Sequence, residues 1–299
     1  MAKLLEGKII AGKIKEDIRS QIDSLRVKPV LASVVVGDNL AAESYIKSQV
    51  KVAKELGIEY QLHRLDSGVR ETDVLDFIRK LNTNDSVHGI IIQDPLPKQL
   101  DYKKVISSVD TKKDVEMVHP NNIGKIIFNE SMMLAPCTVS AVMELISSSG
   151  IDLCGREVVI VGHSEIVGKP LALLLLNKLS TVTVCHIATS KAGRLEEHVK
   201  RAEVLIVAVG SAGLIKGAWV KEGAVVIDVG INRVGGKISG DVEFAAAEKR
   251  AAYITPVPGG VGPLTVVMLM RNLIQLVKSG QGWECRWILK KNYNPGSLC

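Results

Sequence analysis

The feature that most constrains the fold of this chain is a set of short runs rich in valine and isoleucine, each followed by a stretch long enough for a helix. Continuous apolar runs of this kind form the strands of parallel sheets that are covered on both faces. The set falls into two series, one with residues 30–36 and 87–92, the other with residues 157–161, 181–184, 204–209 and 224–228. The helical connections permit right-handed crossovers, so the sequence predicts an α/β protein.

The two series of strands predict two domains, as does the length of 299 residues. We expect a three-layer α/β domain over residues 1–138 and a Rossmann-like, doubly wound nucleotide-binding domain over residues 139–263, with a cleft between them. A long apolar helix is predicted from Leu264, directly after Pro263. Residues 264–299 should pack back on the first domain and complete it.

Composition excludes several classes of protein. Hydrophobic residues make up 46% and charged residues 23% of the chain, as in soluble globular proteins. We find no apolar run near the roughly 18 to 20 residues of a membrane span, and residues 1–7 lack the features of a signal peptide. The five cysteines show no paired spacing, which favours reduced thiols in the cytoplasm and suggests no metal site.

The net charge of +6 does not indicate a nucleic-acid-binding protein. The lysines are spread along the chain, and aromatic residues make up only 4% of it, so there are few stacking platforms for bases. A small anionic ligand explains the charge equally well.

A glycine turn predicts a nucleotide site in the second domain. Residues 162–168 read GHSEIVG, between a strand and an apolar helix, where a phosphate can approach backbone N–H groups. The alternative is a turn that only connects the two elements. An NAD site usually has an acid about 20 residues further on, but residues 185–191 contain none. NADP is therefore favoured, with His163, Lys191 or Arg194 as possible phosphate partners, although the last two could simply be solvated.

Residues 253–265, which read YITPVPGGVGPLT, make the chain similar to a known family. Gly259 and Gly260 allow backbone with positive φ close to a ligand, and the segment resembles the signature of the methylenetetrahydrofolate dehydrogenase/cyclohydrolase family. The resemblance extends to about Lys278. Further matching segments are residues 36–39, 44–45, 92–97, 113–115, 119–120, 135–138 and 228–232.

The resemblance implies oxidation of methylenetetrahydrofolate to methenyltetrahydrofolate by a nicotinamide cofactor, NADP or NAD, followed by hydrolysis to formyltetrahydrofolate. It also implies a cytosolic homodimer that binds its folate substrate in the cleft. The implied catalytic positions are Tyr45, Gln49 and Gln93; the substrate-binding positions are Tyr45, Asp94, Glu116, Pro258, Gly259 and Gly260; the cofactor-binding positions are Thr138, Gly162, His163, Ser164, Val167, Gly168 and Ile231.

Two of these residues have plainer alternatives. In the family the residue matched by Tyr45 stacks on the folate ring, and the one matched by Gln93 tunes a catalytic lysine. Without the resemblance, Tyr45 reads as a rim tyrosine on an amphipathic helix. Gln93 reads as the end of a strand before a proline turn.

The catalytic lysine of the family is missing, because its position holds Gln49. Residues four apart share a helix face, whereas Lys47 and Lys51 lie roughly 200° and 240° around the helix from Tyr45. Hydrolysis needs a group that moves protons, which a neutral amide cannot do. We therefore predict little or no cyclohydrolase activity. Dehydrogenation can survive, because its chemistry resides in the cofactor.

Other positions depart from the family pattern. Glu116 stands in place of aspartate, and Met117 in place of glycine. Asp94 stands at a position that is usually apolar, where it either meets a polar ligand group or faces solvent.

The second domain and the link to it also depart from the pattern. Val139 and Ala141 replace a proline and a glycine, which would relax the hinge between the domains. His163 and Ile187 replace the residues that bind the extra phosphate of NADP, which argues for NAD, but we keep NADP ahead. Two alternatives to a dehydrogenase stay open: a bifunctional enzyme that uses another base, and a non-catalytic paralogue that binds folate or nucleotide.

Overall fold

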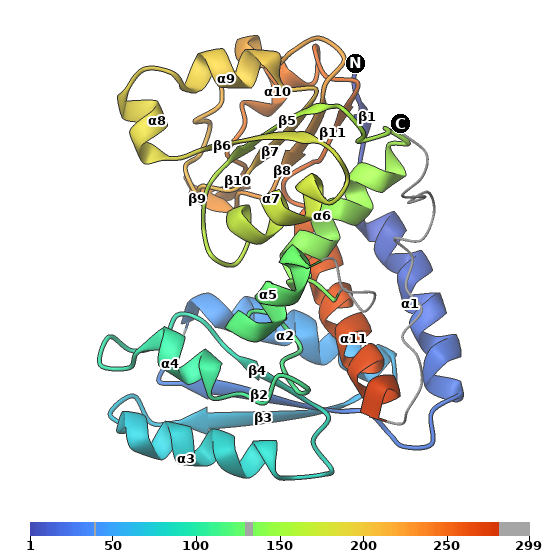
Figure 1. Ribbon diagram of the computed structural model, residues 1–299, viewed down its shortest axis with the longest axis vertical. Helices are drawn as coiled ribbons and strands as arrows, with labels where there is room; N and C mark the ends of the chain where they lie inside the picture. Colours follow the sequence, from blue (N-terminus) through green and yellow to red (C-terminus); the bar gives the residue numbers. More distant parts are fainter. Residues whose placement is uncertain (39, 129–133, 281–299) are drawn as a thin grey trace.

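The computed structural model describes residues 1–38, 40–128 and 134–280, which form two lobes connected by long helices (Figure 1). The lower lobe contains a three-stranded parallel sheet in the order β3-β2-β4. Its strands are β2 (Val30–Val36), β3 (Glu59–Leu65) and β4 (Gly89–Ile92). The two-domain α/β fold predicted from the sequence is confirmed.

Helices cover both faces of this sheet. One face packs with α2 (Leu40–Glu55) and α11 (Val261–Gly280) through a core that includes Leu31, Ile91 and Leu273. On the other face α3 (Glu71–Asn82) and α4 (Tyr102–Ser107) pack through a second core. Every residue of β2 and β4 is buried. This burial on both faces explains why these strands read as continuous apolar runs.

The upper lobe contains a six-stranded parallel sheet in the order β1-β11-β8-β7-β5-β6 (Figure 1). The strands are β1 (Lys3–Leu4), β5 (Glu157–Val161), β6 (Thr181–Cys185), β7 (Val204–Val207), β8 (Val225–Asp228) and β11 (Tyr253–Ile254). Around the sheet lie α7 (Gly168–Leu176), α8 (Ile187–Lys191), α9 (Leu195–Arg201), η1 (Gly217–Trp219) and α10 (Phe244–Ala247), with a hairpin of β9 (Asn232–Val234) and β10 (Lys237–Ser239). The Rossmann-like prediction is confirmed.

In the described part of the chain, three helices link the two lobes in addition to α11. They are α1 (Gly7–Asp23), α5 (Pro120–Ile127) and α6 (Cys137–Ser148). The domain boundary that we placed after residue 138 falls inside α6, which continues without a break. The N-terminal strand β1 joins the upper sheet although it precedes the whole lower lobe in sequence.

Helix α11 passes through the centre of the molecule and packs against α1, α6 and α2. We expected no apolar stretch of membrane-spanning length, but this helix has 20 residues and a mean hydropathy of 1.2. Because 78% of its apolar window is buried inside the protein, it is a core helix. It ends at Gly280, so the predicted packing of residues 281–299 lies outside the described residues.

The cysteines differ in state. Cys137 and Cys185 are buried and free, as we expected for reduced thiols. Cys154, in contrast, is disulfide-bonded, so the expectation of reduced thiols throughout was wrong for this residue.

Candidate active site

Two glutamines that the sequence analysis singled out meet beneath α2. Gln49 lies on α2 and is 0% exposed, and Gln93 directly follows β4 and is 2% exposed. Gln93 Nε2 donates hydrogen bonds to Gln49 Oε1 at 3.0 Å and to Ser33 Oγ at 3.0 Å. Alternation along the sheet puts Ser33 and Gln93 on the face that α2 covers. Ser33, Gln49 and Gln93 thus form a buried polar set beneath α2.

Tyr60 belongs to the same set, and the sequence analysis missed it. Its hydroxyl donates to Gln49 Oε1 at 2.7 Å. Burial raises the pKa of Tyr60 to about 12, so the phenol keeps its proton. Tyr60 pairs with Leu31 in the sheet, two residues before Ser33, and this register puts both side chains on one face. A period-2 reading of β3 against β2 would have found it.

Tyr45 and Glu116 lie near this set. Burial raises the pKa of Tyr45, and negative charge on Cys137, Glu116 or Tyr60 adds to the effect. The pKa of Glu116 is raised to about 8, first by burial and then by the nearby charges of Asp114 and Asp94. Glu116 is therefore a neutral acid near pH 7, which can donate a hydrogen bond as well as accept one.

Met117 and Asp94 are neighbours of these residues in the sequence, and they differ in burial. Met117 is buried and has a φ of 57°, a left-handed conformation that costs a non-glycine residue about 1 to 2 kcal/mol. Asp94 is exposed, which agrees with the solvent-facing alternative.

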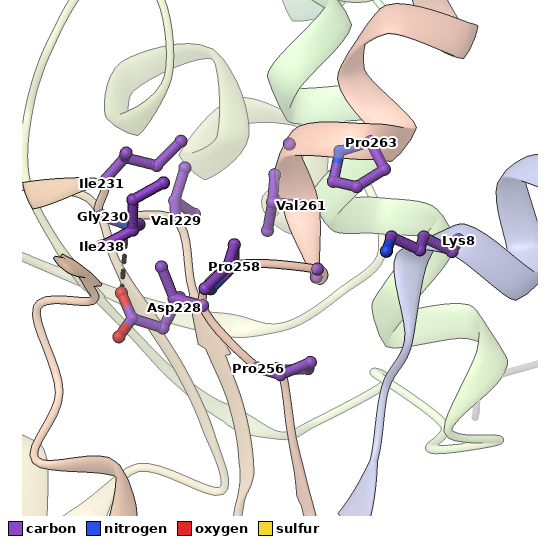
Figure 2. A pocket seen from close by; sticks show the side chains of 14 residues that line it. Lys8, Asp228, Val229, Gly230, Ile231, Ile238, Pro256, Pro258, Val261 and Pro263 are labelled. Carbon is purple, nitrogen blue, oxygen red and sulfur yellow. Dashed lines mark hydrogen bonds between the residues drawn. The ribbon is translucent and has the colours of Figure 1, made fainter.

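A pocket lies between the start of α1 and the loops that follow β8 and β11 (Figure 2). Four of the predicted residues, Ile231, Pro258, Gly259 and Gly260, line it together. The loop runs close to α1, since Gly7 N–H donates to the carbonyl of Gly259 at 3.0 Å. A Cβ on Gly7 would lie 1.8 Å from the carbonyl oxygen of Gly260, so only glycine fits there.

Lys8 lines the same pocket and was not predicted. It is exposed, and Figure 2 shows its ammonium on the side of Lys8 that faces Val261 and Pro258. It supplies positive charge at this pocket, which suits an anionic ligand group. The lysine follows Gly7 at a helix start, and no motif in the sequence distinguished it from the other surface lysines.

Two buried aspartates hold the rim of the pocket. The carboxylate of Asp228 accepts hydrogen bonds from the backbone N–H groups of Gly230, Asp241 and Val242 at 2.9 to 3.0 Å. Asp241 in turn accepts from the N–H groups of residues 209–211 at 2.8 to 3.0 Å. Burial is the main cause that raises the pKa of Asp228 to about 6. These aspartates are occupied by backbone, so their role is to shape the loops at the carboxyl edge of the sheet.

The predicted nucleotide turn follows β5. Gly162 has a φ of 127°, and a Cβ there would lie 2.3 Å from the carbonyl oxygen of Ala208. A Cβ on Gly168, the first residue of α7, would lie 2.1 Å from the carbonyl oxygen of Gly162. Ser164 Oγ accepts from the N–H of Val167 at 3.1 Å and closes the turn. The two glycines therefore permit a tight strand-to-helix turn of the kind that binds phosphate.

Two histidines lie together beside this turn. The rings of His163 and His186 have centroids 5.2 Å apart. His186 directly follows β6, where nucleotide-binding folds contact the ribose. Both are exposed, as are Lys191 and Arg194, whereas Thr138 is half-buried in the first turn of α6. His186 was not predicted, because only the pairing of β5 with β6 brings it to His163.

Among the described residues, no group of three or more histidine, cysteine, aspartate or glutamate side chains could hold a metal ion. The site that the structure offers is thus a neutral polar set, a pocket with one lysine at its rim, and a glycine turn.

In the comparison with known proteins, each lobe matches a domain of one family. Residues 5–116 match the model of the catalytic domain of tetrahydrofolate dehydrogenase/cyclohydrolase, and residues 136–281 match the model of its NAD(P)-binding domain. The bifunctional protein FolD of Acetivibrio thermocellus is 47% identical over 281 residues, which cover 93% of this chain and 97% of that protein.

Solved structures of the same family have the same fold as this chain. The bifunctional methylenetetrahydrofolate dehydrogenase/cyclohydrolase of Campylobacter jejuni has a TM-score of 0.90 at 41% identity, covering 94% of this chain and 100% of that one. The Trypanosoma brucei enzyme, solved with NADP and an inhibitor, has a TM-score of 0.89 at 34% identity, covering 94% of this chain and 98% of that one.

Proposed function

This chain belongs to the tetrahydrofolate dehydrogenase/cyclohydrolase family, and from that premise we propose that it oxidises 5,10-methylenetetrahydrofolate to 5,10-methenyltetrahydrofolate with NAD(P) and has little or no cyclohydrolase activity. The observation that carries the second part is the burial of Gln49 among neutral partners. Its side chain contacts Tyr60 and Gln93, and neither can serve as a cationic proton carrier.

Hydrolysis of the methenyl group requires a water molecule to lose a proton as it attacks. A lysine whose pKa is lowered by burial can accept that proton, and a carboxamide cannot. Tyr60 does not replace the lysine, because burial raises its pKa to about 12 and keeps the phenol protonated. Glu116 is also protonated near neutral pH, since its pKa is raised to about 8. The polar set therefore lacks a ready general base.

Dehydrogenation does not require a general base among these side chains. When bound, the nicotinamide ring accepts the hydride, and the protein has to bind and orient the two reactants. We assign folate contacts to Tyr45, which would stack on the pterin, and to Glu116, which can exchange hydrogen bonds with it. The loop with Gly259 and Gly260 is assigned to the same substrate.

For the cofactor we propose NADP ahead of NAD. The turn from Gly162 to Gly168 is the tight strand-to-helix turn that phosphate-binding sites use, because a Cβ at either glycine would clash with backbone. Residues 186–194, directly after β6, contain no acid, although an NAD site would usually have one there. His163, Lys191 and Arg194 are the candidate partners for the extra phosphate, and His163 lies beside His186 at the end of β6. Ser164, Val167, Thr138 and Ile231 complete the proposed cofactor contacts.

We propose further that the chain acts as a cytoplasmic homodimer, with residues 1–138 and the C-terminal helix as the folate domain and residues 139–263 as the nucleotide domain. The alternative is a bifunctional enzyme that uses another base. It is favoured by one observation, that relatives such as the 47% identical protein are named bifunctional.

One assay separates these functions. Purified protein is given methylenetetrahydrofolate with NADP and, in parallel, with NAD, and absorbance follows both the reduced cofactor and the methenyl product. Under our proposal the methenyl product forms and decays only at its spontaneous rate. Decay faster than in the protein-free control supports the bifunctional alternative. No turnover with either cofactor contradicts the dehydrogenase proposal.

A further inference from the structure

The side-chain amide of Gln49 is held on its oxygen side alone. Gln49 Oε1 accepts hydrogen bonds from Tyr60 Oη at 2.7 Å and from Gln93 Nε2 at 3.0 Å. Gln49 Nε2, in contrast, exposes less than 1 Å² and has no hydrogen-bond partner within the described part of the chain. Buried donors without an acceptor are rare in native proteins, because they forfeit their hydrogen bonds to water. This amide therefore needs an acceptor that the described residues do not supply.

The surrounding groups set which end of the amide is left unpaired. A carboxamide can turn over and exchange its oxygen for its nitrogen, and only its hydrogen-bond partners decide between the two arrangements. Gln93 Nε2 uses one hydrogen for Ser33 Oγ and the other for Gln49 Oε1. Tyr60 adds a second donor to the same oxygen. Two donors directed at one atom hold the oxygen in place, so the N–H groups of Gln49 are the end of the amide that is left for another partner.

We propose that Tyr60 is a positioning residue of the folate site, which holds the Gln49 amide so that its N–H groups donate to an acceptor atom of the bound tetrahydrofolate derivative. This inference rests on the proposed function. A lysine at position 49 would also present N–H donors, together with a charge and a basic nitrogen. The glutamine keeps the donors and gives up the proton carrier, so ligand recognition is retained while hydrolysis is lost.

Gln49 Nε2 is buried, so a ligand reaches this atom only when the groups around it move. Tyr45 is half-buried and precedes Gln49 by four residues on the same face of α2. We expect the Tyr45 ring to turn as it stacks on the pterin, which opens the path to the amide.

The test is calorimetric titration with tetrahydrofolate of the unaltered protein, Gln49→Met, Tyr60→Phe and the double variant. Each single variant should weaken binding by about 3- to 10-fold, the range expected for one neutral hydrogen bond. The double variant should bind no more weakly than Gln49→Met, because Tyr60 acts through Gln49. Gln61→Met is the matched control, since Gln61 lies next to Tyr60 on β3 and its amide donates to Glu59. Its affinity should be unchanged.

Melting temperatures separate this role from a structural one. If Tyr60→Phe lowers the melting temperature and leaves the Kd unchanged, the inference is overturned. It is also overturned if Tyr60→Phe weakens binding equally in the presence and absence of Gln49→Met. If the unaltered protein does not bind tetrahydrofolate, the proposed function fails and this inference fails with it. Binding by the unaltered protein with no change in either single variant leaves the function standing and refutes only the inference.

Discussion

Replacing Gln49 by lysine should restore the hydrolysis that this chain is predicted to lack. The side chain at this position is fully buried and contacts Tyr60 and Gln93, so a lysine there would enter the polar set directly. Burial would lower the pKa of the new ammonium, which is the property that a general base requires near neutral pH. A positioned base contributes about 10² to 10⁴ in rate, or roughly 3 to 5 kcal/mol of barrier.

The same change has an electrostatic consequence at Glu116. The pKa of Glu116 is about 8 against an ordinary 4.5, a difference of about 3.5 that corresponds to roughly 5 kcal/mol. To the extent that the lysine is charged, its ammonium favours the carboxylate, so the pKa of Glu116 should fall toward its ordinary value; the carboxylate in turn opposes the lowering of the lysine pKa. The attraction between the two groups would offset part of the cost of burying the lysine, and we expect Gln49→Lys to fold with a reduced melting temperature.

The assay follows the absorbance of methenyltetrahydrofolate with Gln49→Lys, with the unaltered protein and without protein. Val50→Lys is the matched control, because Val50 is the next residue of α2 and is 40% exposed, so its lysine adds the same charge outside the polar set. The reasoning is refuted if Gln49→Lys folds and binds folate yet hydrolyses no faster than the unaltered protein. It is equally refuted if the unaltered protein already hydrolyses at a rate that the lysine does not increase.

Four further predictions follow from individual side chains. Because the folded chain holds the proton of Glu116 up to about pH 8 and the unfolded chain releases it near 4.5, this group should make the free energy of unfolding fall as pH rises between those values. Glu116→Gln should remove that slope in denaturant titrations from pH 4 to 9, and an unchanged slope would contradict the assignment. His163→Arg should tighten binding of adenosine 2′,5′-bisphosphate relative to ADP by roughly tenfold, because arginine is permanently charged and can bind phosphate with two hydrogen bonds. Lys8→Met should weaken binding of the anionic folate by about two- to fivefold at low salt and hardly at all at high salt, since the lysine is exposed; equal losses at both salt concentrations would argue against a charge effect. Gly230→Ala should destabilise the protein by about 1 to 3 kcal/mol in urea titrations, because its Cβ would lie 2.1 Å from the Asp241 carboxyl carbon.

Much of the fold could be predicted from local patterns in the sequence. The runs at residues 30–36 and 157–161 became β2 and β5 with matching bounds, because strands buried on both faces are apolar at most positions. The start of α11 was predicted to within a few residues, since proline is tolerated in the first turn of a helix. Gly162 was recognised because few other residues adopt its positive φ.

Contacts between distant segments could not be predicted in the same way. Strand β1 joins a sheet whose other strands follow about 150 residues later in the chain. No pattern in the residues around β1 predicts that pairing. Likewise, the length and hydropathy of α11 do not distinguish a core helix from a membrane span, and only its burial does.

For the candidate site, too, some features could be predicted from the sequence and others only from the tertiary structure. The sequence alone determined that a glutamine stands where the family has lysine, because residue identity at an aligned position needs no coordinates. Only the tertiary structure decided what that glutamine does, since its partners Tyr60 and Gln93, and the Ser33 that Gln93 also contacts, come from three different strands or strand ends. Periodicity constrains which face a side chain occupies, but the partner of a buried polar group depends on how separate segments pack, and that is settled only when the whole chain folds.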